Sequence, residues 1–283
     1  MIIDTHANPA TKEFLTDPYG DLVEFSSKFF RTTITPSTIE QMLSDYSSFG
    51  IERVVLHNVN TSHLKKGPSP TNEQLRTLLD KQPDRLLGLC AIDLANFVSA
   101  QKQLEHAISD LHCLGLKISP MLQGIQPNDP AMNAIYDTCV KLQVPLFVDW
   151  GNSAIGINAP GGGGVKLSLN NPMWIDDVAA EFPKLTIVGC HVASPWVEEM
   201  LAVLMHKANV FCVLSGWYPR MFSAELINYM DKRIRNKFMF GSEYPVISPS
   251  RWIAEFQKLE ISQETKDRVL GLNAQEILKI SAS

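Results

Sequence analysis

The chain has 283 residues, of which 45% are hydrophobic and 19% are charged, a composition that argues against long disordered segments. Its 25 Lys and Arg against 30 Asp and Glu give a net charge of −5, and no basic block exceeds two residues, which argues against a nucleic-acid binder. No apolar run is long enough to span a membrane, and the five cysteines include no Cys-x-x-Cys pair. The first residues have neither a basic segment nor a long apolar segment, so we expect no secretory signal there. We therefore expect a cytoplasmic protein with reduced thiols that contacts neither membrane nor nucleic acid.

Eight short apolar segments alternate with helix-type segments along the chain. Because polar residues do not alternate within them, they predict strands that are buried on both faces. These expected strands are residues 2–4, 53–57, 86–92, 116–119, 145–149, 185–190, 210–214 and 237–241. The expected helices are residues 38–49, 72–81, 98–111, 130–142, 172–182, 195–206, 224–235, 249–259, 263–270 and 274–280.

The alternation of eight strands with crossover helices predicts an α/β fold. We expect a (β/α)8 TIM barrel that forms a single domain over residues 1–283, with an open doubly wound sheet as the alternative. Two long stretches, residues 7–35 and 150–171, are expected to be irregular. Both follow a strand, so in a barrel they lie on the carboxyl-terminal face, where such folds carry their functional sites.

Polar side chains follow the carboxyl ends of most of the expected strands. In a barrel these ends converge at one rim, so their side chains meet in one mouth. A mixture of imidazole, carboxylate, amide and ammonium groups in one mouth is typical of a metal site or an acid–base site. The residues concerned are His6, Asn8, His57, Lys117, Asp149, His191 and Glu243.

Several motifs then resemble the amidohydrolase-related family, in order and along nearly the whole chain. They are Ile3-Asp4-Thr5-His6-Ala7-Asn8, Gly115-Leu116-Lys117-Ile118, Pro145-Leu146-Phe147, Ile187-Val188-Gly189-Cys190-His191 and Phe240-Gly241-Ser242-Glu243-Tyr244-Pro245. That family contains metal-dependent hydrolases, aromatic carboxylate decarboxylases and hydratases on a TIM barrel. The resemblance implies the same fold, a small-molecule substrate, and a homodimer as the assembly to test.

The chain departs from the family pattern at several positions. The family opens with His-x-His, whereas here Asn8 follows His6; Asp149 stands at a histidine position, Glu243 at an aspartate position and Ser119 at a further histidine position. The resemblance implies one divalent ion, zinc, manganese or magnesium, on an oxygen-rich set of ligands. Those ligands are His6, Asn8, Asp149 and Glu243. The alternative is that the metal has been lost.

The resemblance also implies roles in catalysis and binding. His191 matches the family's general base or acid, with Glu243 and Lys117 as the other catalytic candidates, and Lys117 would pair with a substrate carboxylate. Trp150, Trp217 and His57 are the expected substrate-binding residues. The expected reaction is hydrolysis or non-oxidative decarboxylation of a small organic carboxylate, lactone or amide. The alternative function is a metal-free or non-catalytic barrel that binds a small ligand or a partner.

Overall fold

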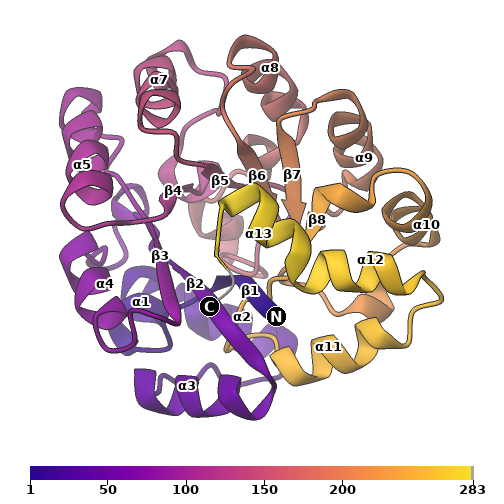
Figure 1. The fold of residues 1–283 in the computed structure, drawn as a ribbon. Helices are drawn as coiled ribbons and strands as arrows, with labels where there is room; N and C mark the ends of the chain where they lie inside the picture. The colour runs from indigo at the N-terminus through magenta and orange to yellow at the C-terminus, as the bar shows by residue number, and fades with distance from the viewer. Residues whose placement is uncertain (282–283) are drawn as a thin grey trace.

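Eight parallel strands form a closed ring in chain order (Figure 1). In this computed structural model, which describes residues 1–281, the ring closes where the Thr5 N–H donates to the carbonyl oxygen of Phe240 at 2.9 Å. The predicted (β/α)8 barrel is therefore confirmed, and the open doubly wound sheet is wrong. The strands are β1 (Ile2–Ala7), β2 (Ile51–His57), β3 (Leu86–Cys90), β4 (Gly115–Ile118), β5 (Leu146–Asp149), β6 (Ile187–Cys190), β7 (Val210–Val213) and β8 (Phe238–Met239).

Helices connect the strands, and several of them begin at a side-chain cap. The hydroxyl groups of Thr38, Thr71 and Ser223 each accept a hydrogen bond from an N–H of the first helical turn. The helices are α1 (Lys12–Leu15), α2 (Leu22–Phe30), α3 (Ile39–Ser48), α4 (Asn72–Leu79), α5 (Phe97–Ser109), α6 (Pro120–Gln123), α7 (Asn133–Leu142), α8 (Met173–Glu181), α9 (Val197–His206), α10 (Ala224–Lys232), α11 (Pro249–Gln257), α12 (Gln263–Asp267) and α13 (Asn273–Leu278).

Two stretches differ from the expected pattern. Residues 7–35 are not irregular, because they contain α1 and α2. The expected break at Gly271 is also wrong: a π-helical turn, Arg268–Leu272, joins α12 to α13 without interruption. A Cβ at Gly271 would lie 2.1 Å from the carbonyl oxygen of Met1, so this glycine permits a close backbone approach rather than ending the helix.

Alternate residues of each strand point into the barrel or outward toward the helices. The inward residues pack in one buried cluster that includes Val55 of β2 and Phe147 of β5. Two residues further along the same faces come His57 and Asp149, which end their strands. The period of two therefore places these polar side chains at the carboxyl-terminal mouth of the barrel, directly above an apolar floor.

The two long stretches that follow β1 and β5 pack against each other over this mouth. We call residues 17–30 and 154–169 together the lid. A small apolar cluster that includes Tyr19, Leu22 and Ile155 joins its two halves, and the Ser26 hydroxyl donates to the carbonyl oxygen of Ala154. A Cβ at Gly163 would lie 2.5 Å from the end of the Leu22 side chain, and its φ of 63° also favours glycine at this contact. The lid thus covers the region where the strand ends converge.

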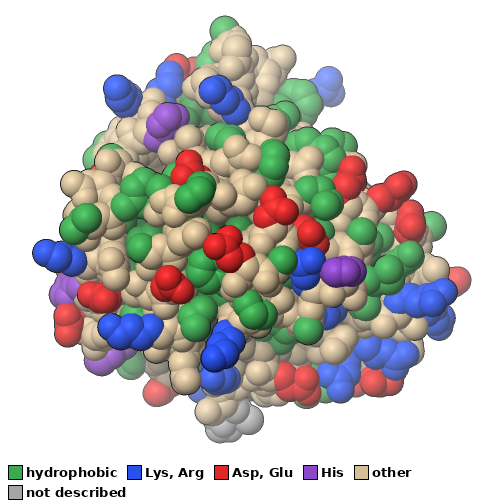
Figure 2. All heavy atoms as spheres, turned by 90° about the horizontal axis from the view of Figure 1, so that it is seen from above, with side chains coloured by type: hydrophobic (Ala, Val, Ile, Leu, Met, Phe, Trp, Pro, Cys, Tyr) green, Lys and Arg blue, Asp and Glu red, His purple; other side chains and the backbone are tan. Residues whose placement is uncertain are grey.

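Within residues 1–281 there is no helix of the length and hydropathy needed to cross a membrane. The face drawn in Figure 2 interleaves acidic, basic and apolar side chains, with acidic groups toward its middle and basic groups mostly toward its edge. That pattern differs from the continuous basic stripe of a nucleic-acid-binding face.

Candidate active site

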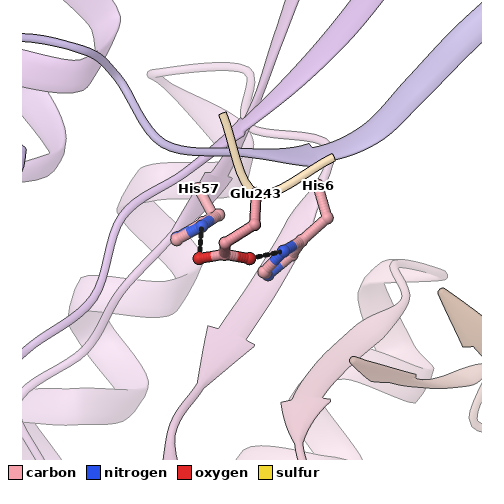
Figure 3. A group of neighbouring side chains, drawn as sticks. All are labelled: His6, His57 and Glu243. Carbon is pink, nitrogen blue, oxygen red and sulfur yellow. Dashed lines mark ion pairs between the residues drawn. The ribbon is translucent and has the colours of Figure 1, made fainter. Parts of the chain in front are cut away.

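Two histidines and a glutamate from adjacent strands meet at the mouth of the barrel (Figure 3). His6 lies on β1, His57 ends β2, and Glu243 follows β8. Because β8, β1 and β2 are neighbours in the ring, their carboxyl ends bring these side chains together. Glu243 Oε2 lies 2.6 Å from His6 Nδ1, Glu243 Oε1 lies 3.6 Å from His57 Nε2, and the two imidazole rings stack with their centroids 4.1 Å apart.

The polar atoms of this cluster are buried and largely unsatisfied. Among the described residues, no hydrogen-bond partner is aligned with either ring nitrogen of His6, either ring nitrogen of His57, or Oε2 of Glu243. The 2.6 Å approach of Glu243 to His6 lacks hydrogen-bond alignment. A buried polar atom without a partner costs about 1–3 kcal/mol. The cluster therefore destabilises the folded protein unless a ligand or ion pairs with these atoms.

The donor set fits a divalent metal ion. One ligand atom from each of His6, His57 and Glu243 lies within 4.8 Å of the others. Burial lowers the pKa of His6 to about 3, so its imidazole is neutral at pH 7 and keeps a lone pair. Two imidazoles and a carboxylate form a set that zinc, manganese and iron accept, with positions left open for substrate.

A second set of side chains completes the site. Lys117 from β4 forms an ion pair with Asp149 at the end of β5, and His191 Nε2 lies 3.4 Å from the same carboxylate oxygen. The rings of His191 and His6 are edge to face with their centroids 5.4 Å apart. The two sets therefore form one continuous site, and one ligand atom each from His6, Asp149 and Cys190 also lie within 4.8 Å of one another.

Charges in this second set shift the pKa of its members. Burial alone would raise the pKa of Asp149, but the Lys117 ammonium and His191 outweigh it and hold that pKa far below its usual range. Burial alone would lower the pKa of Lys117, and the Asp149 carboxylate raises it instead. For His191, the hydrogen bond to Asp149 and the charges of Glu243 and Asp149 outweigh burial, so its pKa is raised above 6.5. These contacts therefore favour the protonated form of His191 more than in a free imidazole.

The backbone is strained at His191 and Glu243. Their φ angles are 78° and 65°, in the left-handed region that residues other than glycine rarely adopt. Each such conformation costs on the order of 1–3 kcal/mol and persists where the surroundings enforce it. For His191 those surroundings include Trp150 Nε1, which donates to its carbonyl oxygen at 2.8 Å, and Ser215 Oγ, which lies 3.0 Å from its Nδ1.

Asp4 ties the end of β1 to the segment after β8. It is fully buried, and its Oδ1 accepts hydrogen bonds from the N–H groups of His6 at 3.2 Å and Ser242 at 3.0 Å. Its Oδ2 accepts from the Ser242 hydroxyl and from the Tyr46 hydroxyl, the latter at 2.8 Å. Burial raises the pKa of Asp4 to about 6. This carboxyl group therefore sets the relative positions of His6 and Glu243.

We expect Tyr46→Phe to loosen this connection without unfolding the protein. The substitution removes one hydrogen bond from buried Asp4, which should lower the free energy of unfolding by about 1–2 kcal/mol. Metal affinity should fall at least about 10-fold, because groups that orient metal ligands are worth that much. Urea denaturation and metal titration would measure the two effects. Tyr229→Phe on α10 is the matched control, and equal behaviour of the two variants would contradict this role.

Most of the residues expected from the sequence meet in this mouth, but some have other contacts. Asn8 donates its Nδ2 to Glu243 Oε1 at 3.2 Å and to the carbonyl oxygen of Tyr244 at 3.0 Å, so it presents an amide nitrogen rather than an oxygen to Glu243. Asp149 forms an ion pair with Lys117. Metal ligation by Asn8 and Asp149 stays a prediction, with these contacts competing against it.

The two expected substrate-binding tryptophans differ in exposure. Trp150 is fully buried, and Trp217 is half-buried with its carbonyl oxygen accepting a hydrogen bond from Trp252 at 2.9 Å. Substrate contact by Trp150 and Trp217 stays a prediction. His57, expected as a substrate contact, lies within the group of potential metal ligands, and its contact with substrate stays a prediction. That position could have been anticipated, because His57 ends a buried strand next to the strand that carries His6.

Comparisons with known proteins support this assignment of the fold. The chain is 21% identical over 242 residues to a 2-amino-3-carboxymuconate-6-semialdehyde decarboxylase of Dictyostelium discoideum. The matched region covers 73% of this chain and 65% of that relative, which is less than two thirds of the relative's length. A solved structure of an uncharacterized TIM-barrel protein from Bordetella bronchiseptica is 22% identical, covers 99% of this chain and 98% of its own, and gives a TM-score of 0.80.

A dihydroxybenzoic acid decarboxylase from Polaromonas, solved with bound manganese and the inhibitor 2-nitroresorcinol, is similar in fold. It is 16% identical, covers 100% of this chain and 98% of its own, and gives a TM-score of 0.74. At such identities the solved structures establish the barrel and no more. The model of one family, described as amidohydrolase, matches residues 3–280. The resemblance expected from the sequence is thereby confirmed, and the chain belongs to the amidohydrolase family.

Proposed function

We propose that this protein is a metal-dependent enzyme that removes CO2, without oxidation, from a small carboxylic acid, with aromatic acids as the first class to test. The observation that carries the proposal is the unsatisfied cluster of His6, His57 and Glu243, which lies beside the proton-holding pair of His191 and Asp149. The relatives named as decarboxylases, one of them with manganese, support the choice of reaction.

Each residue of the site would have a separate role in the decarboxylation. His6, His57 and Glu243 would hold the ion, which when bound supplies a Lewis acid for a carboxylate or phenol oxygen. As the C–C bond to the carboxylate breaks and CO2 leaves, the electron pair stays on the substrate carbon. His191 would donate a proton to that carbon, and Asp149, whose carboxylate lies 3.4 Å from its Nε2, would stabilise the charged form of the imidazole. Lys117 would keep Asp149 ionised.

We expect His191→Asn to abolish this proton transfer while leaving metal content unchanged. Removing a general acid typically lowers turnover by about 10²–10⁴-fold. The assay is CO2 release from 2,6-dihydroxybenzoate and related acids by the manganese-loaded protein, with product analysed in D2O for one deuterium on the carbon that lost CO2. His206→Asn, an exposed histidine on α9, is the control. Full activity of His191→Asn, or absence of the deuterium, would contradict the assignment.

A second candidate, a metal-free barrel that only binds a ligand, is favoured by one observation. Asp149 already has a fixed cation in Lys117, so the carboxylate that was expected to bind metal is neutralised by the protein itself. Elemental analysis separates the two candidates. Close to one ion per chain after incubation with manganese or zinc and desalting supports the enzyme, whereas no retained ion supports the ligand-binding barrel.

A further inference from the structure

Two buried polar groups between the ends of β4 and β5 have no partner. Ser119 and Asn170 are each only 1% exposed. In the part of the chain that the structure describes, neither the Ser119 hydroxyl nor the Asn170 Nδ2 makes a hydrogen bond. Each such group costs about 1–3 kcal/mol when it is left dry and unpaired. Neither group belongs to the metal-type cluster or to the Lys117–Asp149–His191 set.

The strand pattern, continued by one residue, turns Ser119 toward the barrel mouth. β4 ends at Ile118, but Ser119 keeps an extended backbone (φ −126°, ψ 92°) and lies two residues after Lys117, which points inward to Asp149. The Ser119 side chain is small. On the adjacent strand, the residue after Cys90 of β3 is Ala91, which is also small and buried. The β3–β4 side of the mouth therefore has small side chains, next to the β8–β1–β2 side that carries His6 and His57.

Asn170 is fixed beside the same strand ends by its own contacts. Its backbone carbonyl oxygen accepts from the N–H of Gly151 at 2.8 Å, two residues beyond Asp149. Its Oδ1 accepts from the N–H of Met121 at 3.2 Å, two residues beyond Ser119. Because a backbone N–H occupies Oδ1, the orientation of the amide is determined and Nδ2 remains as a free donor.

We propose that Ser119 and Asn170 form a substrate subsite that binds an oxygen substituent of the substrate. The proposal rests on the proposed function, since it assigns a second contact in that site. An unpaired O–H and an unpaired N–H2 group, on two segments that the Met121–Asn170 hydrogen bond holds together, fit a hydrogen-bond acceptor, such as a phenol, phenolate or second carboxylate oxygen. Met121, which Asn170 binds, packs with Tyr19 of the lid, so the lid encloses this end of the substrate.

The test combines ligand binding with stability. The probes are 2,6-dihydroxybenzoate and 2,6-dimethylbenzoate, which have similar shapes but differ in their oxygen substituents. They are titrated calorimetrically into the manganese-loaded full chain carrying His191→Asn, so that turnover does not disturb the binding measurement. Ser119→Ala and the isosteric Asn170→Asp, which keeps the bond from Met121, should each weaken the dihydroxy probe roughly 10-fold or more. Binding of the dimethyl probe should change less than about 2-fold. Ser168→Ala, an exposed serine of the same segment, should change neither.

Melting of the metal-free protein supplies an independent readout. If the Ser119 hydroxyl awaits a ligand, Ser119→Ala should melt at the wild-type temperature or up to about 4 °C above it. A fall of more than about 2 °C would mean that the hydroxyl has an internal partner, and it would overturn the subsite. Unchanged affinity for the dihydroxy probe in both variants would also overturn it. If the protein with Ser119 and Asn170 unchanged binds neither probe, that result counts against the proposed aromatic substrate. The melting temperature of Ser119→Ala then determines whether the subsite proposal stands.

Discussion

Replacing His57 with alanine should abolish tight metal binding while the barrel stays folded. His57 supplies one of only two imidazoles in the cluster, and its side chain stacks on His6 without hydrogen bonds to the rest of the described chain. Losing a direct ligand should exceed the roughly 10–100-fold loss that follows removal of a group behind a ligand. We therefore expect affinity for manganese or zinc to fall at least about 100-fold, measured by titration of the metal-free protein.

The same titration distinguishes His57 from Asp149 as a ligand. The sequence alone predicts that Asp149→Ala removes the metal, whereas the Lys117–Asp149 ion pair favours His57 in that role. His63→Ala, an exposed histidine after β2, is the matched control and should bind like wild type. If His57→Ala still binds the metal tightly and Asp149→Ala loses it, Asp149 and not His57 is the ligand.

Replacing Lys117 with methionine should cause the largest loss of stability. Lys117 is 1% exposed and its ammonium is the cation that pairs with buried Asp149. Removing one partner of a buried ion pair leaves an uncompensated charge and costs about 3–5 kcal/mol, most of it from the stranded partner. Urea denaturation of Lys117→Met should show a loss of that size.

A double variant separates the charge effect from simple loss of packing. Lys117→Met with Asp149→Asn removes both charges, so much of the lost stability should return. Lys81→Met is the surface control, because Lys81 and Glu40 form an exposed pair that should contribute less than about 1 kcal/mol. If Lys117→Met loses no more stability than Lys81→Met, the Lys117–Asp149 pair does not carry the charge balance of the site.

The barrel could be predicted because its signal is local. Segments such as Leu146–Asp149 and Ile187–Cys190 are short and apolar, and the helices between them begin at capping side chains. The helix α2 was not predicted, since its Leu22 packs on a partner surface of apolar residues from distant segments, such as Val59 and Ile155. Nothing within residues 7–35 reveals that partner, and tertiary contact rather than propensity stabilises so short a helix.

The location of the candidate site could be predicted from the sequence more readily than the contacts among its residues. Strand ends identify His6, Lys117, Asp149, His191 and Glu243, and the structure brings all of them to one mouth. Which of them pair depends on distances across the ring. Lys117 reaches Asp149 because β4 and β5 are neighbours, and Glu243 reaches His57 across β1. Such pairings follow from barrel geometry and not from spacing along the chain.

A crystal grown with manganese and measured at a wavelength where manganese scatters anomalously would test the central claim most directly. We expect a single anomalous peak within bonding distance of His6, His57 and Glu243, with the Lys117–Asp149 ion pair intact beside it. A peak held by Asp149 with Asn8 or Cys190, or a mouth without a peak at saturating manganese, would contradict the account.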